Sequence, residues 1–487
     1  MTLSFDPDSL SLPSGHFIGE SLITADGVIP MHRPSDGKAY ALCPRADADM
    51  VDRAVETAKT ALKRSNWGGV RPRERLNVMH RWADLIETEA VTLARLEALS
   101  STRPVGHLIE GDIAISTEQI RFFAEFADKE GSDLVPTDDG NLGMIMTEPY
   151  GVVGAITPWN FPISMAAWKL GPALAAGNAV VLKPSEMTPF SAVYLAELAV
   201  RAGMPAGLIN VVLGDGPLTG NAITGHPDIA KVSFTGSSRA GSAIMENVAR
   251  TGIKPMTLEL GGKSPQLVFA DADLDKAAAA ITTSIISNAG QACVAGSRLI
   301  VEESVAAPLV DAILRHMNTV RPMPTWDAAA QYSPIISDQQ RQRINSIICA
   351  SVAAGAECLT GGLPMDAPGY FYAPTLIAGV DERSAAVTQE IFGPVLTLQT
   401  FRDEEEALSL AAHPTYGLAA GLFTRDLSRA IRITRKLQAG TIWVNRYGRS
   451  RDHILPTGGY KQSGIGKDLG REAFHANRKS KSVLIRL

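Results

Sequence analysis

The sequence is poor in cysteine: only four of its 487 residues are Cys, namely Cys43, Cys293, Cys349 and Cys358. Their spacing matches neither a dense disulfide framework nor a set of metal ligands, so we expect free thiols, no metal site and no disulfides. The first residues, MTLSFDPDSLSLPSG, lack the basic start and apolar core of a secretory signal. These absences argue against a secreted scaffold and predict a cytoplasmic protein.

Long hydrophobic runs and an excess of positive charge are also absent. The most apolar stretches, such as AAAAITTSII at 277–286, are far shorter than the roughly 20 residues of a spanning helix. The chain carries 46 Lys+Arg against 51 Asp+Glu, a formal net charge of -5, which argues against a broad surface for nucleic acid. We therefore expect neither a membrane nor a nucleic acid as partner. With 45% hydrophobic and 20% charged residues, the composition is typical of a globular protein.

Hydrophobic spacing predicts an α/β fold. Two early stretches repeat apolar residues every three or four positions and predict amphipathic helices: ADMVDRAVETAKTALKRS and RLNVMHRWADLIETEA. From about residue 150, short apolar runs alternate with helices, a pattern that predicts βαβ units and a buried parallel sheet. Gly177 and Gly203 are expected to cap helix C-termini. A second α/β unit follows Gly261, with strands expected at PQLVFA, SRLIVEE and GTIWVN.

Two further strands belong to neither unit. LGMIMTEP at 142–149 and KSVLIRL at 481–487 are expected to leave their edges unpaired in a monomer, and natural proteins usually cover such edges. We predict that these strands pair across subunits.

A candidate phosphate-binding turn lies in FTGSSRAGS, residues 234–242. Gly236 permits a tight turn after a strand and Ser237 can cap the following helix, whose free N–H groups suit a phosphate. The stretch has neither G-x-G-x-x-G nor a P-loop, so an ordinary strand-to-helix turn is the alternative. We set aside GDGPLTG at 214–220, which is richer in glycine but lies in the wrong context.

The stretch LKPSE, residues 182–186, ends a predicted strand. Pro184 holds Lys183 extended and directs its amine from the carboxyl edge of the sheet, where open α/β sheets bind ligands. Glu186 can accept from ribose hydroxyls and would then disfavour a 2′-phosphate, which favours NAD over NADP. Alternatively, it simply stabilises the first turn of a helix.

Two loops offer polar groups suited to carbonyl chemistry. PWNFP places Asn160 between two prolines that stiffen the loop, as a preorganised oxyanion donor requires. LELGGKSP ends a strand at Glu259, which can serve as general base if burial raises its pKa. A turn asparagine and a solvated strand-end glutamate are the alternative interpretations.

Cys293 lies in NAGQACVAGS, residues 288–297. A lone cysteine is usually a small buried residue, but Gly290, Ala292 and Ala295 are expected to leave space around this sulfur. Residues 289–295 are expected to begin a helix, whose N-terminal dipole would lower the pKa of the thiol.

Together these stretches resemble one family. PWNFP, KPSE, FTGSSRAG, LELGGKSP, GQAC, EIFGPV and GGYKQSGIGKDLG occur in the order seen in the NAD(P)-dependent aldehyde dehydrogenase superfamily, which the chain resembles over nearly its whole length. The resemblance implies a Rossmann-like cofactor domain (residues 1–126 and 150–260), an α/β catalytic domain (261–470) and a small β oligomerisation element (127–149 and 471–487). It also implies a homodimer or homotetramer.

The resemblance assigns roles to individual residues. It implies Cys293 as nucleophile, Glu259 as general base and Asn160 as oxyanion donor. The implied contacts to NAD, or possibly NADP, are Lys183, Glu186, Gly236, Ser237, Gly241, Glu390, Phe392, Ile156 and Trp159. The implied substrate tunnel contains Trp168, Met165, Val294 and Thr457, the last where phenylalanine is frequent in the family.

The implied reaction oxidises an aldehyde to its acid through a thiohemiacetal and a thioester that Glu259 helps to hydrolyse. Three alternatives remain: a relative that transfers the acyl group to CoA, a cysteine hydrolase without redox chemistry, and an inactive binding protein. NRYGRSRDH at 445–453 adds Arg446, Arg449 and Arg451 near the tunnel. A solvated loop is the default, but such arginines would favour a carboxylated aldehyde.

Overall fold

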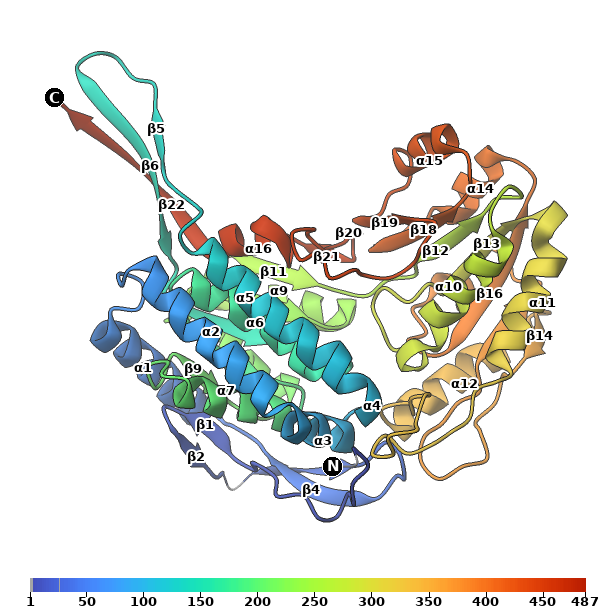
Figure 1. Ribbon diagram of the computed structural model, residues 1–487, viewed down its shortest axis with the longest axis horizontal. Helices are drawn as coiled ribbons and strands as arrows, with labels where there is room; N and C mark the ends of the chain where they lie inside the picture. The colour runs from blue at the N-terminus through green and yellow to red at the C-terminus, as the bar shows by residue number, and fades with distance from the viewer. Residues whose placement is uncertain (1–2, 26) are drawn as a thin grey trace.

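Two α/β lobes lie side by side and an arm of strands projects from one of them (Figure 1). This computed structural model describes residues 3–25 and 27–487. All four cysteines are free. Among the described residues, every helix is too short or too polar to span a bilayer.

The first lobe contains an eight-stranded sheet in the order β2-β1-β9-β8-β7-β10-β11-β21. The neighbours from β9 to β11 are parallel, as the buried apolar runs predicted, whereas β1 and β21 join antiparallel at either side. Because the chain order reverses between β7 and β10, a crevice for a ligand is expected at their carboxyl ends. The strands are β1 (His16–Ile18), β2 (Ser21–Ile23), β7 (Val152–Ile156), β8 (Ala179–Lys183), β9 (Ile209–Val211), β10 (Lys231–Thr235), β11 (Met256–Glu259) and β21 (Gly464–Ile465).

Helices cover this sheet. The predicted amphipathic helices are confirmed as α1 and α2, and they bury apolar residues such as Val55 and Trp82. Gly177 and Gly203 follow α6 and α7 with φ of 96° and 90°, which confirms both expected caps. The helices are α1 (Ala48–Ser65), α2 (Pro72–Thr88), α3 (Ala90–Ser100), α4 (Val105–His107), α5 (Ala114–Phe126), α6 (Pro162–Ala175), α7 (Phe190–Arg201), α8 (Asn221–Gly225), α9 (Ser238–Thr251) and α16 (Gly470–Ala476).

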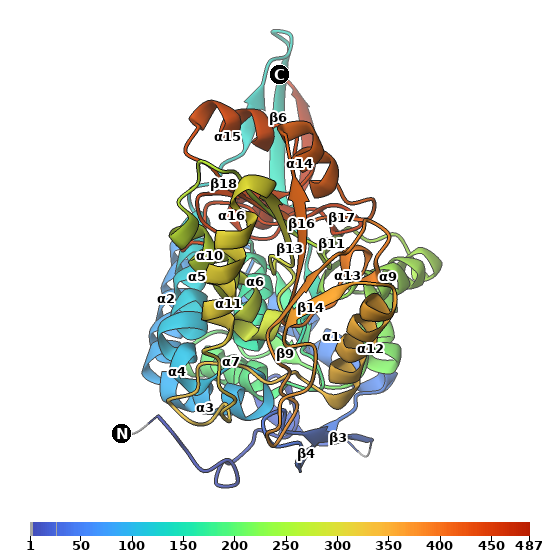
Figure 2. The ribbon, with the colours of Figure 1, turned by 90° about the vertical axis from the view of Figure 1, so that its right-hand side faces the viewer.

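The second lobe, which faces the viewer in Figure 2, contains a seven-stranded sheet in the order β14-β15-β16-β13-β12-β18-β19. All neighbours except β14 and β15 are parallel, and the three strands expected after Gly261 are present as β12, β13 and β19. The strands are β12 (Pro265–Val268), β13 (Arg298–Glu302), β14 (Glu357–Thr360), β15 (Thr375–Ala378), β16 (Val395–Phe401), β18 (Ala419–Phe423) and β19 (Thr441–Val444). The helices are α10 (Leu274–Ile286), α11 (Ala306–Met317), α12 (Asp338–Ala353), α13 (Ala385–Thr388), α14 (Glu404–Ala411) and α15 (Leu427–Thr434).

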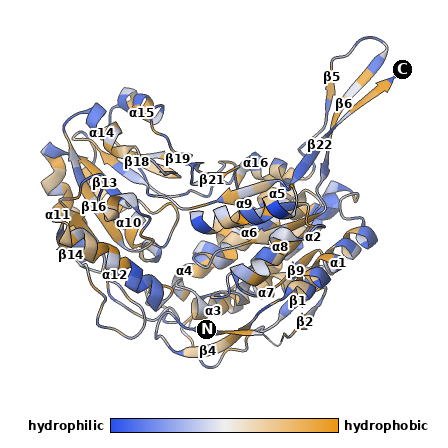
Figure 3. Ribbon diagram, turned by 180° about the vertical axis from the view of Figure 1, so that it is seen from behind, coloured by the Kyte–Doolittle hydropathy of each residue, from blue (hydrophilic) through white to orange (hydrophobic). Residues whose placement is uncertain are grey.

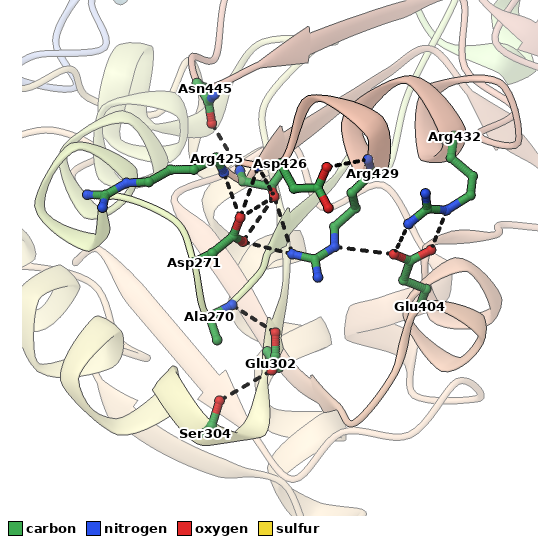
Figure 4. Close-up of polar contacts among 11 residues, drawn as sticks. Ala270, Asp271, Glu302, Ser304, Glu404, Arg425, Asp426, Arg429, Arg432 and Asn445 are labelled. Atoms are coloured by element: carbon green, nitrogen blue, oxygen red, sulfur yellow. Dashed lines mark hydrogen bonds and ion pairs between the residues drawn. The ribbon is translucent and has the colours of Figure 1, made fainter.

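The carboxyl ends of β12 and β18 also meet at a reversal of chain order, but polar groups of the protein fill that position (Figure 4). Asp271 accepts hydrogen bonds from the Thr424 hydroxyl and from the backbone N–H groups of Arg425 and Asp426. It also pairs with Arg429 at 2.8 Å, and Arg429 pairs with Glu404 at 3.2 Å. Because these groups satisfy one another, the first sheet offers the better position for a ligand.

The projecting arm corrects one expectation. Its sheet has the order β22-β6-β5, and β22 (Arg478–Arg486) pairs antiparallel with β6 (Asn141–Pro149) along their whole length. The two strands expected to be unpaired therefore pair with each other, and β5 (Asp133–Val135) covers the other edge of β6. The expectation of an unpaired edge is therefore wrong for β6, because sequence does not show that segments more than 300 residues apart are neighbours. Pairing of this arm across subunits stays a prediction.

The arm carries exposed apolar residues, and Figure 3 shows hydrophobic segments in it beside hydrophilic ones. Leu484 is 66% exposed and Leu134 is 72% exposed, and within the described chain β22 pairs with β6 alone. Two minor pairs complete the fold: β3 (Val28–His32) with β4 (Ala39–Pro44), and β17 (Tyr416–Gly417) with β20 (Tyr460–Lys461).

Candidate active site

A cavity of about 1330 Å³ lies where the two lobes meet. The loops after β7 and β10 line one side of it with Trp159, Asn160 and Gly236, at the reversal of the first sheet. The second lobe contributes Cys293 and Glu390 to the same cavity. The fold therefore collects most of the sequence-predicted site residues around a single space.

Cys293 lies in an irregular segment between α10 and β13, where it is half-buried and lines the cavity. The helix expected at 289–295 is absent: a short 3-10 turn, Ser287–Gly290, ends before the cysteine. Burial raises the pKa of the Cys293 thiol, the charge and hydrogen bond of Arg449 oppose that rise, and Glu259 and Glu390 add to it. The expected lowering by a helix dipole is therefore wrong, because no helix begins there.

The small residues beside Cys293 serve packing within the protein. Asn288, Ala289 and Gly290 all have positive φ, between 49° and 69°. A Cβ on Gly290 would lie 2.0 Å from the carbonyl oxygen of Gly393. Ala295 belongs to the second lobe's core, although it also lines the cavity. Gly290 is therefore required by its close contact with the Gly393 backbone, and its effect on the space around the sulfur stays a prediction.

Asn160 is tied to the segment that carries the cysteine. Its Nδ2 donates to the carbonyl oxygen of Gln291 at 3.0 Å, and Asn288 Nδ2 donates back to the Asn160 carbonyl oxygen at 2.9 Å. Gln291 is fixed in turn, because its Nε2 donates to Pro334 O and its Oε1 accepts from Ile336 N. Among the described residues, no group accepts from the second Nδ2–H of Asn160, which can therefore donate to a ligand, and these bonds hold the amide rigidly.

Glu259 ends β11 and is only 4% exposed, and no group of the described chain hydrogen-bonds its Oε1. Burial raises the pKa of Glu259 to about 8; the negative charge of Asp468 adds to the rise, and the positive charges of Lys169, Arg449 and Lys467 oppose it. Asp468 and Lys169 form a buried ion pair of 2.5 Å. A buried carboxyl with a raised pKa is suited to exchange a proton near neutral pH.

The turn after β10 has the geometry expected of a phosphate site. Ser237 is the N-cap of α9 and accepts from the Ala240 N–H, and both Gly236 and Ser237 line the cavity. Thr235 also lines it, and its buried hydroxyl has no partner among the described residues. Gly241 lies inside α9 away from the cavity lining, where a Cβ would meet Leu260 at 2.7 Å. Its small size therefore permits close packing of α9 on the strand.

The other expected cofactor contacts lie beside this turn. Lys183 ends β8, donates to the carbonyl oxygens of Pro184 and Gly214, and lies 3.6 Å from Glu186. Glu390 accepts from the Gly262 N–H at 3.0 Å. The rings of Trp159 and Phe392 meet edge to face at 5.3 Å. Three of the expected cofactor contacts, Ile156, Lys183 and Gly241, are buried outside the cavity lining. The other six line the cavity: Glu186, Gly236, Ser237, Glu390, Phe392 and Trp159.

The expected tunnel residues also line the cavity: Trp168, Met165, Val294 and Thr457. Arg449 lies among them, with its guanidinium carbon 4.5 Å from the centre of the Trp168 ring. Its Nη2 donates to the Thr457 hydroxyl at 2.8 Å.

Sequence reasoning missed Lys169 and Asp468. One signal was available for Lys169, because it is the only charged residue in α6, whose fourteen residues are all buried. A buried lysine needs a partner, but its partner is 299 residues further along the chain.

The chain was compared with known proteins. A model described as the aldehyde dehydrogenase family matches residues 23–483. Retinaldehyde dehydrogenase 3 of Homo sapiens is 38% identical over 468 residues, covering 94% of this chain and 91% of that protein. Cytosolic 10-formyltetrahydrofolate dehydrogenase of Homo sapiens is 36% identical over 483 residues, 98% of this chain but 53% of that longer protein. The structure of an indole-3-acetaldehyde dehydrogenase complexed with NAD+ superposes with a TM-score of 0.96, at 38% identity and coverage of 99% and 98%.

Proposed function

The chain belongs to the aldehyde dehydrogenase family and oxidises an aldehyde to the carboxylic acid with NAD, and on this premise we propose that Cys293 is its nucleophile, Glu259 its general base and Asn160 its oxyanion donor. One observation carries the proposal. Asn160 lines the same cavity as Cys293 and is hydrogen-bonded to the segment that bears it, and the charge of Glu259, which is buried outside the lining, acts on that thiol.

The residues after β7, β8 and β10 fit a dinucleotide. The Gly236 N–H donates to the Glu259 carbonyl oxygen, so the N–H groups of the first turn of α9, which begins at Ser238, are the ones offered to a pyrophosphate. Thr235 lines the same cavity, and its hydroxyl has no partner among the described residues. Lys183 and Glu186 lie at the carboxyl end of the neighbouring strand, where we assign them to a ribose. Bound NAD supplies a hydride acceptor at its nicotinamide ring.

Cys293 begins the reaction by adding its sulfur to the aldehyde carbon, which forms a thiohemiacetal. The oxygen that was the carbonyl becomes negatively charged in this adduct. Asn160 Nδ2 donates to that oxygen, and because the amide is already fixed by the Gln291 segment it need not reorganise. Loss of hydride from the adduct leaves a thioester on Cys293.

Glu259 completes the reaction by removing a proton from water as the water attacks the thioester carbon. The thiolate then leaves, and the acid is released. The buried Glu259 carboxyl near the thiol favours hydrolysis of the thioester over transfer of the acyl group to CoA. It also argues against an inactive binding protein. A cysteine hydrolase would need no NAD, so NADH formation separates that alternative.

The organisation of the chain follows the same proposal. We assign residues 1–126 and 150–260 to a cofactor domain, apart from residues 1, 2 and 26, which lie outside the described structure. We assign 261–470 to a catalytic domain, of which β21 (Gly464–Ile465) joins the sheet of the first lobe. We assign 127–149 and 471–487 to an oligomerisation element in a homodimer or homotetramer, supported by the exposed apolar arm. A cytoplasmic location is supported by the four free cysteines.

Cys293→Ala provides the test. The variant should form no NADH from any aldehyde while still binding NAD, because Cys293 is the only proposed covalent group. The acyl intermediate of the wild-type enzyme should be trapped and the protein digested. Mass spectrometry should then detect the acyl adduct on the peptide that contains Cys293. Cys349→Ala, which removes an exposed cysteine, is the matched control. Normal turnover in Cys293→Ala would contradict the assignment.

A further inference from the structure

The loop at residues 445–453 places its three arginines in different surroundings. Arg446 is exposed, donates to the Gly448 carbonyl oxygen at 3.3 Å and does not line the cavity. Arg451 lines the outer cavity but is paired with Glu118 at 2.9 Å. Arg449 is half-buried and reaches the tunnel beside Cys293.

Arg449 is held from two sides. Its guanidinium lies over the Trp168 ring, a cation–π contact with 4.5 Å between the guanidinium carbon and the ring centre. The Thr457 hydroxyl accepts from Nη2, and Thr457 is only 4% exposed. The Thr457 backbone is fixed by paired hydrogen bonds with Asp468, at 2.7 and 2.9 Å. The threonine that stands where phenylalanine is frequent in the family thus provides an acceptor that orients the arginine.

The charge of Arg449 acts on the buried Glu259 and on Cys293, but no ion pair among the described residues matches it. In the part of the chain that the structure describes, its guanidinium pairs with neither an Asp nor a Glu. Asp112 lines the same cavity but is engaged by Arg103 at 2.7 Å, and Asp452 is exposed. A planar guanidinium with free N–H groups matches the two oxygens of a carboxylate.

We propose that Arg449, oriented by Trp168 and Thr457, binds a carboxylate carried by the substrate, so that the preferred substrates are short aldehydes with an acid group at the other end. The proposal rests on the proposed function, because it needs the aldehyde carbon at Cys293. The aldehyde must be short because Arg449 and Cys293 line the same cavity and the charge of Arg449 acts on the thiol. A carboxylate on this guanidinium therefore lies only a few bonds from the reacting carbon.

The test compares succinic semialdehyde with butanal, which has the same number of carbons and no carboxylate. Wild-type enzyme should prefer succinic semialdehyde in kcat/KM. Arg449→Met should lower the ratio of kcat/KM for succinic semialdehyde to kcat/KM for butanal by about 10- to 100-fold, the range for a lost charged hydrogen bond. The ratio of the two substrates is the readout because any effect of Arg449 on the thiol itself cancels in it.

Three further variants sharpen the comparison. Arg449→Lys keeps the charge without the planar fork and should retain part of the preference. Thr457→Val removes the acceptor and should lower the ratio by about 3- to 10-fold through the less ordered arginine. Arg446→Met removes an exposed arginine of the same loop and should leave the ratio unchanged.

Equal kcat/KM for the two substrates in wild-type enzyme would overturn the inference. An Arg449→Met variant that lowers kcat/KM equally for both substrates would also overturn it, since Arg449 would then act on the thiol alone. If Arg449→Met does not fold, product inhibition of wild-type enzyme decides: succinate should inhibit more strongly than butanoate, and equal inhibition would contradict the inference. Absence of NADH with every aldehyde would instead contradict the proposed function.

Discussion

Replacement of Glu259 by glutamine tests the second half of the reaction. Glu259 is 4% exposed, and burial raises its pKa to about 8. If the ionised carboxylate must take a proton from water, about a tenth of it is active at pH 7 and most of it at pH 9. The rate of thioester hydrolysis should therefore rise about tenfold over that interval.

Glu259→Gln preserves the size of the side chain but cannot accept the proton. Steady-state kcat should fall by about 10²- to 10⁴-fold, while the first turnover should still produce NADH because Cys293 and Asn160 are intact. Rapid mixing with aldehyde and NAD, followed by NADH absorbance, should show a burst close to one NADH per Cys293 and then almost no further turnover. Glu246→Gln, on an exposed glutamate of α9 whose nearest ion-pair partner is Arg250 at 3.5 Å, is the control.

The burst and the steady state must be measured separately, because burial also raises the pKa of Cys293. The burst rate should rise with pH in both wild-type enzyme and Glu259→Gln, since it depends on the thiolate. The tenfold rise of the steady-state rate should be lost in the variant alone. Unchanged steady-state turnover in Glu259→Gln would refute the assignment of the base. Loss of the burst would show that Glu259 is needed for formation of the thioester and not only for its hydrolysis.

Three other outcomes follow from the same geometry. Asn160→Ala should lower kcat by about 100- to 1000-fold, the cost of about 3–4 kcal/mol for a lost oxyanion donor; a loss below tenfold in a variant that melts normally would argue against that role. Glu186→Ser should raise the ratio of kcat/KM with NADP to that with NAD, because it removes a negative charge from the proposed ribose site; an unchanged ratio would place Glu186 elsewhere. Leu484→Asp, at a site 66% exposed on the arm, should reduce the mass measured by sedimentation if the arm is an interface, whereas a normal mass would exclude this position from it.

Local sequence determined the elements and the turns of the first lobe. The buried runs at β7, β8 and β10, the caps at Gly177 and Gly203, and the Gly236–Ser237 turn could all be predicted, because each depends on residues within a few positions of one another. The place of Glu259 at the end of a strand could also be predicted, and the residue that ends a parallel strand lies at the carboxyl edge of the sheet.

Predictions that depended on distant packing failed or were incomplete. The segment at 289–295 has small, helix-compatible residues, yet Ala289 and Gly290 adopt positive φ, and Gly290 lies against the Gly393 carbonyl. Strands β6 and β22 pair with each other because the fold returns the C-terminus to the arm. No local pattern reports such contacts.

The sequence by itself determined the family, the order of the motifs and the residues able to act as nucleophile, base and donor. Only the tertiary structure decided how these groups are charged and paired. It buries Glu259 near the Lys169–Asp468 pair. It also brings Arg449 onto Trp168, although the two residues are far apart in the sequence. The physical reason is that burial and charge depend on what surrounds a side chain in space, and in this fold those neighbours come from segments far apart in sequence.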